Sequence, residues 1–156
     1  MAGNVTVRDL GWRRFKTAAR DLDGKGVKVG IRARDAGKQN DGVDVIDIAL
    51  WNELGTSDGR VPKRPFMRHT ADTSKAEVVA AASRWAGMIL AGKLSADRAL
   101  ASLGEFYKMK IQATIRGSKA WAVPNAAETV RRKGSSTPLV DQGVMLGTVD
   151  WERDDK

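Results

Sequence analysis

The sequence contains no cysteine and a single histidine among its 156 residues. Without cysteine the fold has neither disulfides nor thiolate metal sites, so it needs no oxidising compartment. One histidine does not supply the three or four ligands of a typical zinc site, and neither an HExxH nor a CxxC motif is present. We therefore expect His69 to be a surface or packing residue, and we expect no metal and no cofactor.

Long apolar runs are also missing. No segment approaches 18 consecutive apolar residues, which excludes a membrane-spanning helix and predicts no membrane partner. The first residues lack the apolar run of a secretory signal, so we expect synthesis in the cytoplasm. Hydrophobic residues make up 42% and charged residues 29%, which is the balance of a globular protein. At this length we expect one domain with a hydrophobic core.

Recognisable catalytic motifs are scarce. No Gly-x-Ser-x-Gly elbow accompanies the histidine, and no Gly-Lys-Ser/Thr phosphate loop occurs. Gly24, Gly26 and Gly30 precede and enter an expected strand, whereas the glycines of a dinucleotide fingerprint follow one. The acids at 41–47 lack the terminal glutamate of a calcium loop. We expect a protein that is not an enzyme, and a nuclease or peptidoglycan hydrolase is the third interpretation.

The net charge of +8 is unevenly distributed. Residues 1–38 carry ten bases and four acids, residues 39–59 five acids and no base, and residues 60–70 four bases and no acid. Residues 134–156 carry five acids and two bases. These blocks are either solvated faces of a basic protein or patches of opposite sign that meet between subunits joined head to tail. Nucleic-acid binding has less support, because no compact Lys/Arg run with interleaved aromatics occurs.

The first third of the chain predicts a helix, a strand and a loop. Residues 9–22 have the apolar spacing of an amphipathic helix, and alternation over 27–34 predicts a half-buried strand. The polar, glycine-containing segment 35–42 predicts an exposed loop. The residues expected to face inward are Leu10, Phe15, Ala18, Ala19 and Leu22 on the helix, and Val27, Val29, Ile31 and Ala33 on the strand.

Helices dominate the middle of the chain. Residues 45–54 predict a short helix ended by Gly55, although the β-branched run at 43–48 leaves a strand as the alternative. After an extended crossing, a long helix begins either near Pro65 or at a capping box formed by Ser74 and Glu77. The apolar stripe expected on this helix is Val78, Ala81, Ala82, Trp85, Met88 and Ile89. A short connection to a second helix, from Ser95 to Ile115, makes the two antiparallel neighbours.

The last forty residues predict shorter elements. We expect a helical stretch at 126–132, a flexible connection at 133–138, and a helical turn at 139–146 capped by Asp141. Residues 147–151 alternate like a final strand, and the charged tail 152–156 should be disordered. The fold class is therefore α+β: a small, mostly antiparallel sheet packed against two long antiparallel helices plus an N-terminal helix, in one domain over residues 1–151.

Three segments resemble one family of tailed-bacteriophage proteins. Ala49–Thr56 is similar to its pattern of a short apolar stretch, an acid, an aromatic or Leu, and Gly-Thr. Val61–Arg68 is similar to its Pro-x-Arg-Pro-Phe segment, which leads into a long helix. Pro138–Gly143, with Met145, is similar to its Pro-Leu-x-Asp-Thr-Gly element before a C-terminal strand. The family comprises tail-completion, neck and virion-morphogenesis proteins, and the resemblance covers roughly residues 26–151.

The resemblance implies a structural virion protein that completes the tail or joins it to the head by ring-type assembly. It implies a homo-oligomer within the particle, located at the head–tail junction or upper tail, and in the host cytoplasm during assembly. The implied partners are other neck and tail proteins, namely an adaptor, a tail terminator or a tail-tube protein. The alternative function is a nucleic-acid-binding module that makes non-specific contact with DNA at the neck or tail channel.

Three sets of residues are candidates for these roles. The loop 55–64, held by rigid flanks, is expected to form a subunit contact in which acids of one chain meet bases of the next. The interface set is Glu53, Asp58, Arg60, Lys63, Arg64 and Arg68. The structural-motif set, expected to turn the chain and anchor a helix, is Gly55, Thr56, Pro62, Pro65, Phe66, Met67, Pro138, Asp141 and Gly143. The DNA-facing set is Lys28, Arg32 and Arg34.

Overall fold

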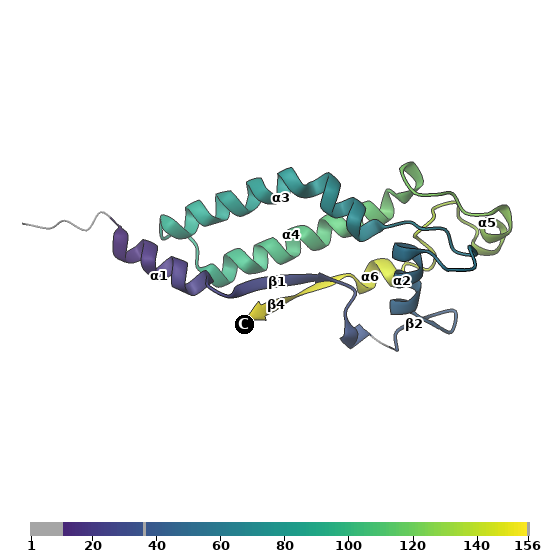
Figure 1. Ribbon diagram of the computed structural model, residues 1–156, viewed down its shortest axis with the longest axis horizontal. Helices are drawn as coiled ribbons and strands as arrows, with labels where there is room; N and C mark the ends of the chain where they lie inside the picture. The colour runs from purple at the N-terminus through teal and green to yellow at the C-terminus, as the bar shows by residue number, and fades with distance from the viewer. Residues whose placement is uncertain (1–10, 36, 156) are drawn as a thin grey trace, which may run out of the picture.

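The computed structural model describes residues 11–35 and 37–155, which form an elongated α+β domain (Figure 1). The two longest helices lie side by side along the molecule, and a two-stranded sheet runs along the second of them. The elements are α1 (Trp12–Leu22), β1 (Lys25–Gly30), η1 (Ala33–Asp35), β2 (Gln39–Asn40), β3 (Val43–Asp44), α2 (Val45–Leu54), α3 (Phe66–Leu90), α4 (Ala96–Arg116), η2 (Ser118–Ala120), α5 (Ala127–Lys133), α6 (Val144–Thr148) and β4 (Asp150–Asp155). The predicted fold class is confirmed.

The helices α3 and α4 form the predicted antiparallel pair. Gly92, with φ of 70°, turns the chain between them, and the Ser95 hydroxyl accepts a hydrogen bond of 3.3 Å from the Arg98 amide at the start of α4. Trp85 and Phe106 meet edge to face, with ring centroids 6.1 Å apart. The apolar stripe expected on α3 thus packs toward α4, where Ile89 is buried.

The start of α3 settles one of the alternatives. The helix begins at Phe66, directly after Pro65, and Ser74 lies buried in its interior. Of the two predicted starts, the one at Pro65 is confirmed and the capping box at Ser74 and Glu77 is wrong. Proline suits a helix start because its fixed φ and missing N–H do no harm there.

The strands β1 and β4 pair antiparallel, in a register that runs from Lys25 opposite Asp155 to Gly30 opposite Asp150. Two sequence predictions are corrected here. The first strand ends at Gly30 instead of continuing to residue 34, because a turn begins in which the Arg32 amide donates to the Asp35 carboxylate at 3.1 Å. The tail at 152–155, expected to be disordered, belongs to β4, since its backbone pairs with β1.

Within the segment 35–42, Gly37, Lys38, Asp41 and Gly42 are exposed, as predicted for a loop, but Asp35 is buried and Gln39–Asn40 form a short strand. Asp35 is 3% exposed and its carboxylate lies 2.7 Å from the Lys38 ammonium. Strand β2 pairs with β3 in a short hairpin that leads into α2. The predictions for residues 1–10, including an inward-facing Leu10, fall outside the described residues, as does the inward side chain expected for Ala33.

Helix α2 is confirmed over its strand alternative. The Asp44 carboxylate accepts hydrogen bonds from the amides of Ile46 (2.9 Å) and Gly37 (2.7 Å), which cap the helix and hold the hairpin beside it. Gly55 ends the helix with φ of 78°. Val45 and Ala49 face the core and are buried, whereas Leu50 and Leu54 are exposed.

Two hydrophobic clusters hold the elements together. The larger one joins α2, α3, α4, α6 and the segment before α6; its buried members are Val45, Ala49, Phe66, Ile111, Ile115, Leu139, Met145 and Val149. The smaller one consists of Ala18, Ile89 and Ala99 and attaches α1 to the far end of the helix pair. Ala18 is the buried residue of α1, and Phe15 and Ala19, expected inside, lie outside.

The C-terminal elements begin later than predicted. Helix α6 starts at Val144 after Gly143, whose φ is 80°, and no side chain caps it, so the cap expected at Asp141 is wrong. The strand begins at Asp150 because residues up to Thr148 continue the helix. Among the residues that the structure describes, no helix combines the length and apolar character needed to span a membrane.

Candidate functional site

The loop after α2 is closed by a network around Thr56. Its hydroxyl donates to the Asp58 carboxylate at 2.6 Å and accepts from the Val61 amide at 3.0 Å. The Thr56 amide donates to the Val61 carbonyl at 3.1 Å. Asp58 also lies 3.2 Å from the Arg60 guanidinium, so this acid meets a base of its own loop. Hydrogen bonds from Thr56 and from the Arg60 amide lower the pKa of Asp58.

Arg64, expected at a subunit contact, is instead buried, with 6% of its surface exposed. Its Nε donates to the Val123 carbonyl at 2.8 Å, and its Nη2 donates to the Pro124 carbonyl and the Asn125 side chain, both at 3.2 Å. The backbone amide of Arg64 donates to the Asn52 carbonyl at 2.6 Å. Burial lowers the pKa of this guanidinium, which still remains charged in proteins. Arg64 therefore fastens the loop to α2 and to the segment after η2.

Glu53 also acts within its own chain. Its two carboxylate oxygens accept hydrogen bonds from the amides of Met67 (2.9 Å) and Arg68 (3.1 Å), in the first turn of α3. Pro65, directly before this helix, offers no side-chain cap. A carboxylate is well suited to this position because the first N–H groups of a helix lack partners and carry partial positive charge. Glu53 thereby fixes where α2 ends relative to where α3 begins.

The segment 138–145 is anchored by backbone and core contacts. The Leu139 amide donates to the buried Ser118 hydroxyl at 3.3 Å, and the side chains of Leu139 and Met145 enter the larger core cluster. Between them the chain is exposed enough for Gln142 to donate to the Asp41 carboxylate at 2.8 Å. The segment is thus held at both ends while its middle lies on the surface.

The two segments meet at a groove of about 700 Å³. One wall is formed by α2 and its following loop, the other by α5 and the segment before α6, at the end of the molecule that carries α5 (Figure 1). The sequence-predicted residues that line it are Arg60, Pro62, Arg64, Pro138, Asp141 and Gly143. The remaining members of the interface and motif sets lie outside its lining: Glu53, Asp58, Lys63, Arg68, Gly55, Thr56, Pro65, Phe66 and Met67.

The groove contains residues that sequence reasoning missed. Trp51, 40% exposed, contributes an aromatic surface, and Arg132 and Lys133 of α5 add bases. Burial lowers the pKa of Lys133, with smaller contributions from Arg64 and Arg132, while Asp141 opposes the change. The basic run of α5 was visible in the sequence, but nothing there indicated that it faces a loop seventy residues earlier. Chemically, the groove combines an aromatic surface with bases and two acids, Asp41 and Asp141, so it suits a polar or charged protein segment.

The residues expected to face DNA are paired within the chain. Arg32, with a side chain 8% exposed, lies 2.9 Å from Asp150 and 2.8 Å from Glu152. Arg34 also pairs with Asp150, and the Lys28 ammonium lies 2.8 Å from Asp154. The acids of β4 thus pair with the bases of β1 and its following turn, while the side chains of Lys28 and Arg34 remain 62% and 56% exposed.

His69 is a packing residue, as expected. Its ring stacks on Trp121 with centroids 4.1 Å apart and an interplanar angle of 9°. The described part of the chain contains no group of three or more His, Cys, Asp or Glu side chains placed to hold a metal ion.

Comparison of the chain with protein-family models, with curated proteins and with solved structures gave no significant match.

Proposed function

We propose that this protein is a structural component of a tailed bacteriophage that completes the tail or joins it to the head. It acts by ring-type assembly of identical chains and makes or breaks no covalent bond. Its partners are other neck and tail proteins, such as an adaptor, a tail terminator or a tail-tube protein. It resides at the head–tail junction or upper tail of the virion.

One observation supports the proposal most directly. The segments that resemble the phage family, 49–68 and 138–145, lie far apart in sequence, yet they form facing walls of one groove. Buried Arg64 and the Glu53 cap hold this region rigidly, as a surface that must fit a partner requires. Because the two segments face each other, a shared role in binding a partner is favoured over two separate roles in turning the chain.

Inactivation of the gene in the phage genome that encodes this protein tests the proposal. Electron microscopy of the lysate should show filled heads and separate tails, and the wild-type chain supplied in trans should restore joined virions. Normal infectious virions from the inactivated genome would overturn the proposal.

A groove variant refines the same experiment. Arg132→Glu combined with Lys133→Glu should fail to restore joined virions, because it reverses the charge of one wall. Arg84→Glu, at an exposed position on α3, is the matched control and should complement like the wild type. Equal circular dichroism spectra for the purified variants would exclude misfolding as the cause.

A further inference from the structure

Helix α2 carries an apolar stripe on its outer face. Asp47, Leu50, Trp51 and Leu54 follow the spacing of one helix face and all point outward. Leu50 is 50% exposed and Leu54 is 66% exposed. A helix with apolar residues on all sides is typical of a buried position, and contiguous exposed apolar residues commonly mark an interface. This set is called the α2 stripe below.

Helix α1 carries a second stripe with the same spacing. Trp12, Phe15, Lys16 and Ala19 lie on one face and are all exposed. The Trp12 and Phe15 rings stack with centroids 5.5 Å apart, and the Lys16 ammonium lies 5.6 Å from the Trp12 ring centroid. Large aromatic side chains held rigidly at a surface are typical anchors of protein–protein interfaces. This set is called the α1 stripe.

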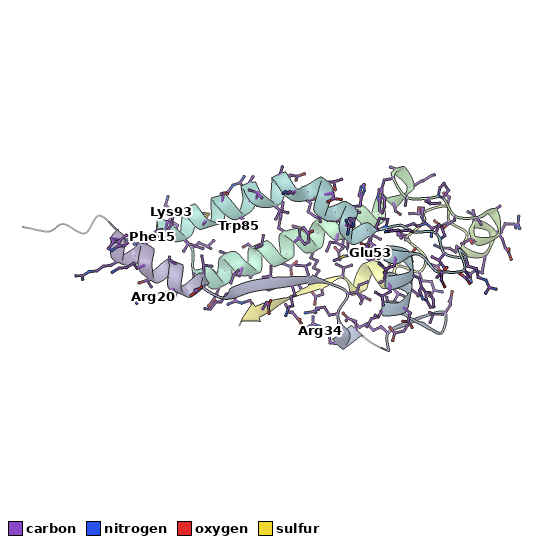
Figure 2. The ribbon with its side chains drawn as sticks, viewed as in Figure 1. Phe15, Arg20, Arg34, Glu53, Trp85 and Lys93 are labelled. Atoms are coloured by element: carbon purple, nitrogen blue, oxygen red, sulfur yellow. The ribbon has the colours of Figure 1, made fainter. Side chains whose placement is uncertain are left out.

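The two stripes lie toward opposite ends of the molecule. Figure 1 shows α1 at one end of the long helix pair and α2 toward the other, and Figure 2 shows Phe15 and Glu53 in the same relation. The stripes therefore cannot meet within one chain. A contact between them joins two copies through different surfaces, and repetition of such a contact generates a ring or a filament.

The charges of the two helices are complementary. Helix α1 contains four bases and one acid: Arg13, Arg14, Lys16, Arg20 and Asp21. Helix α2 contains two acids and no base, and it begins after Asp44. Each stripe includes one charged residue, Lys16 on α1 and Asp47 on α2. Opposite charges on the two faces favour their association over the pairing of either face with itself.

A cavity beside the α2 stripe can accommodate an aromatic side chain of a second copy. Its volume is about 420 Å³, and its lining includes Leu50 together with Ile31, Ile46 and Met67. Its lining carries two acids, Glu53 and Glu152, and two bases, Lys28 and Arg32, so it is the apolar side chains of the cavity that suit it to Phe15.

We infer that the α1 stripe of one copy packs against the α2 stripe of the next copy, head to tail. The occupant of each stripe is thus a second copy of this chain. The inference rests on the proposed ring assembly and names the elements that form its repeating contact.

Cross-linking between introduced cysteines tests the contact, because the natural chain has none to interfere. A tagged Ala19→Cys chain, which keeps both aromatic rings of the α1 stripe, and an untagged Leu54→Cys chain are mixed at high concentration and treated with a short bismaleimide. Virions built from both chains are treated likewise. The mixed dimer should exceed either symmetric dimer. One chain with both substitutions should give a ladder of multimers whose last step reports the ring size.

Val79→Cys replaces Leu54→Cys in the matched control, because Val79 is 57% exposed on α3 outside both stripes. Lys16→Glu should lower the yield of mixed dimer by roughly tenfold, and Asp47→Lys in the partner chain should restore it. If Ala19→Cys couples to Leu54→Cys no better than to Val79→Cys, in solution and in virions, the inference is overturned. Gene inactivation tests the proposed function separately from the contact. If heads and tails fail to join without the gene but the cross-link does not form, the proposed function stands and the contact between α1 and α2 is wrong.

Discussion

At the scale of single residues, burial and close packing decide which side chains are structural. Arg64 belongs to a run of bases in the sequence, yet its guanidinium is enclosed by the carbonyls of Val123 and Pro124. Gly104 on α4 is small because a Cβ there would lie 2.4 Å from Trp151 Cδ2 on β4. Substitution of Arg64 or Gly104 should therefore change the stability of the fold more than substitution of an exposed residue would.

Substitution of Arg64 by Lys should destabilise the fold. Lysine keeps the charge but not the planar set of donors, so several of the carbonyl and amide oxygens now bound by Arg64 would be left without a partner. Since hydrogen bonds to charged groups contribute about 1.5–3 kcal/mol each, we expect a loss of roughly 3 kcal/mol in urea unfolding. Lys63→Ala, at the exposed neighbour, should change stability by about 0.5 kcal/mol or less. Equal unfolding midpoints for the two variants would contradict the role assigned to Arg64.

Two glycine-to-alanine substitutions should have opposite effects. Gly104→Ala forces the Trp151 ring away from α4, and overpacking of this kind destabilises by about 1–3 kcal/mol. Gly87→Ala on α3 meets nothing within 4 Å and should stabilise by about 0.5–1 kcal/mol, because alanine is the better helix former. Thermal or urea unfolding of both variants measures the difference, and a Gly104→Ala variant at least as stable as the wild type would count against the packing of β4 on α4.

At the scale of elements, β4 completes the sheet and neutralises its bases. Its backbone pairs with β1, its acids pair with Lys28, Arg32 and Arg34, and Arg153 pairs with Asp97 on α4. The charged end of the chain therefore lies against two other elements.

Removal of residues 152–156 should consequently destabilise the protein, by about 2 kcal/mol from the lost cross-strand pairs and ion pairs. The double variant Glu152→Gln and Asp154→Asn keeps the backbone pairing and should lose less than half as much. Denaturant unfolding of both chains compares the two contributions. A truncated chain as stable as the full one would show that the pairing of β4 beyond Trp151 contributes nothing.

At the scale of the whole molecule, several carboxylates couple stability to pH. Hydrogen bonds from the amides of Gly37 and Ile46 lower the pKa of Asp44, and the Arg153 guanidinium lowers that of Asp97. Burial alone would raise the pKa of Asp150, but the Trp151 amide, Lys108 and Arg34 outweigh it and the net shift is downward. Groups with a lowered folded-state pKa stabilise the fold above their unfolded value of 3.8 and lose this contribution as pH falls through the folded value.

The free energy of unfolding should therefore decrease as the pH falls below about 4. Asp44→Asn should retain most of the stability at neutral pH, since asparagine is also a good N-cap, but its decline below pH 4 should be shallower. Urea unfolding at a series of pH values measures both slopes. Parallel curves for the variant and the wild type would show that Asp44 does not contribute to the acid sensitivity.

The sequence by itself determined the local elements of this protein. Periodic apolar residues and turn signals such as Gly55, Gly92 and Ser95 predicted α2, α3 and α4, because helix propensity and capping depend on neighbours within a few residues. The alternation of apolar and polar residues predicted β1. The same kind of local signal gave wrong predictions at Ser74 and Asp141, where the residue spacing of a helix cap occurs but no helix begins.

Only the tertiary structure decided which charges are available and which elements face one another. Arg32 pairs with acids 118 and 120 residues away, and Arg64 with groups about 60 residues away, so no local pattern revealed that they are buried. The acids and bases of residues 53–64, which were expected to form contacts between subunits, likewise bind within one chain. Glu53 caps α3, Asp58 closes the loop after α2, and Arg64 is buried. Sequence periodicity shows that a helix has an apolar face, but packing decides which faces the core leaves uncovered, as on α1 and α2.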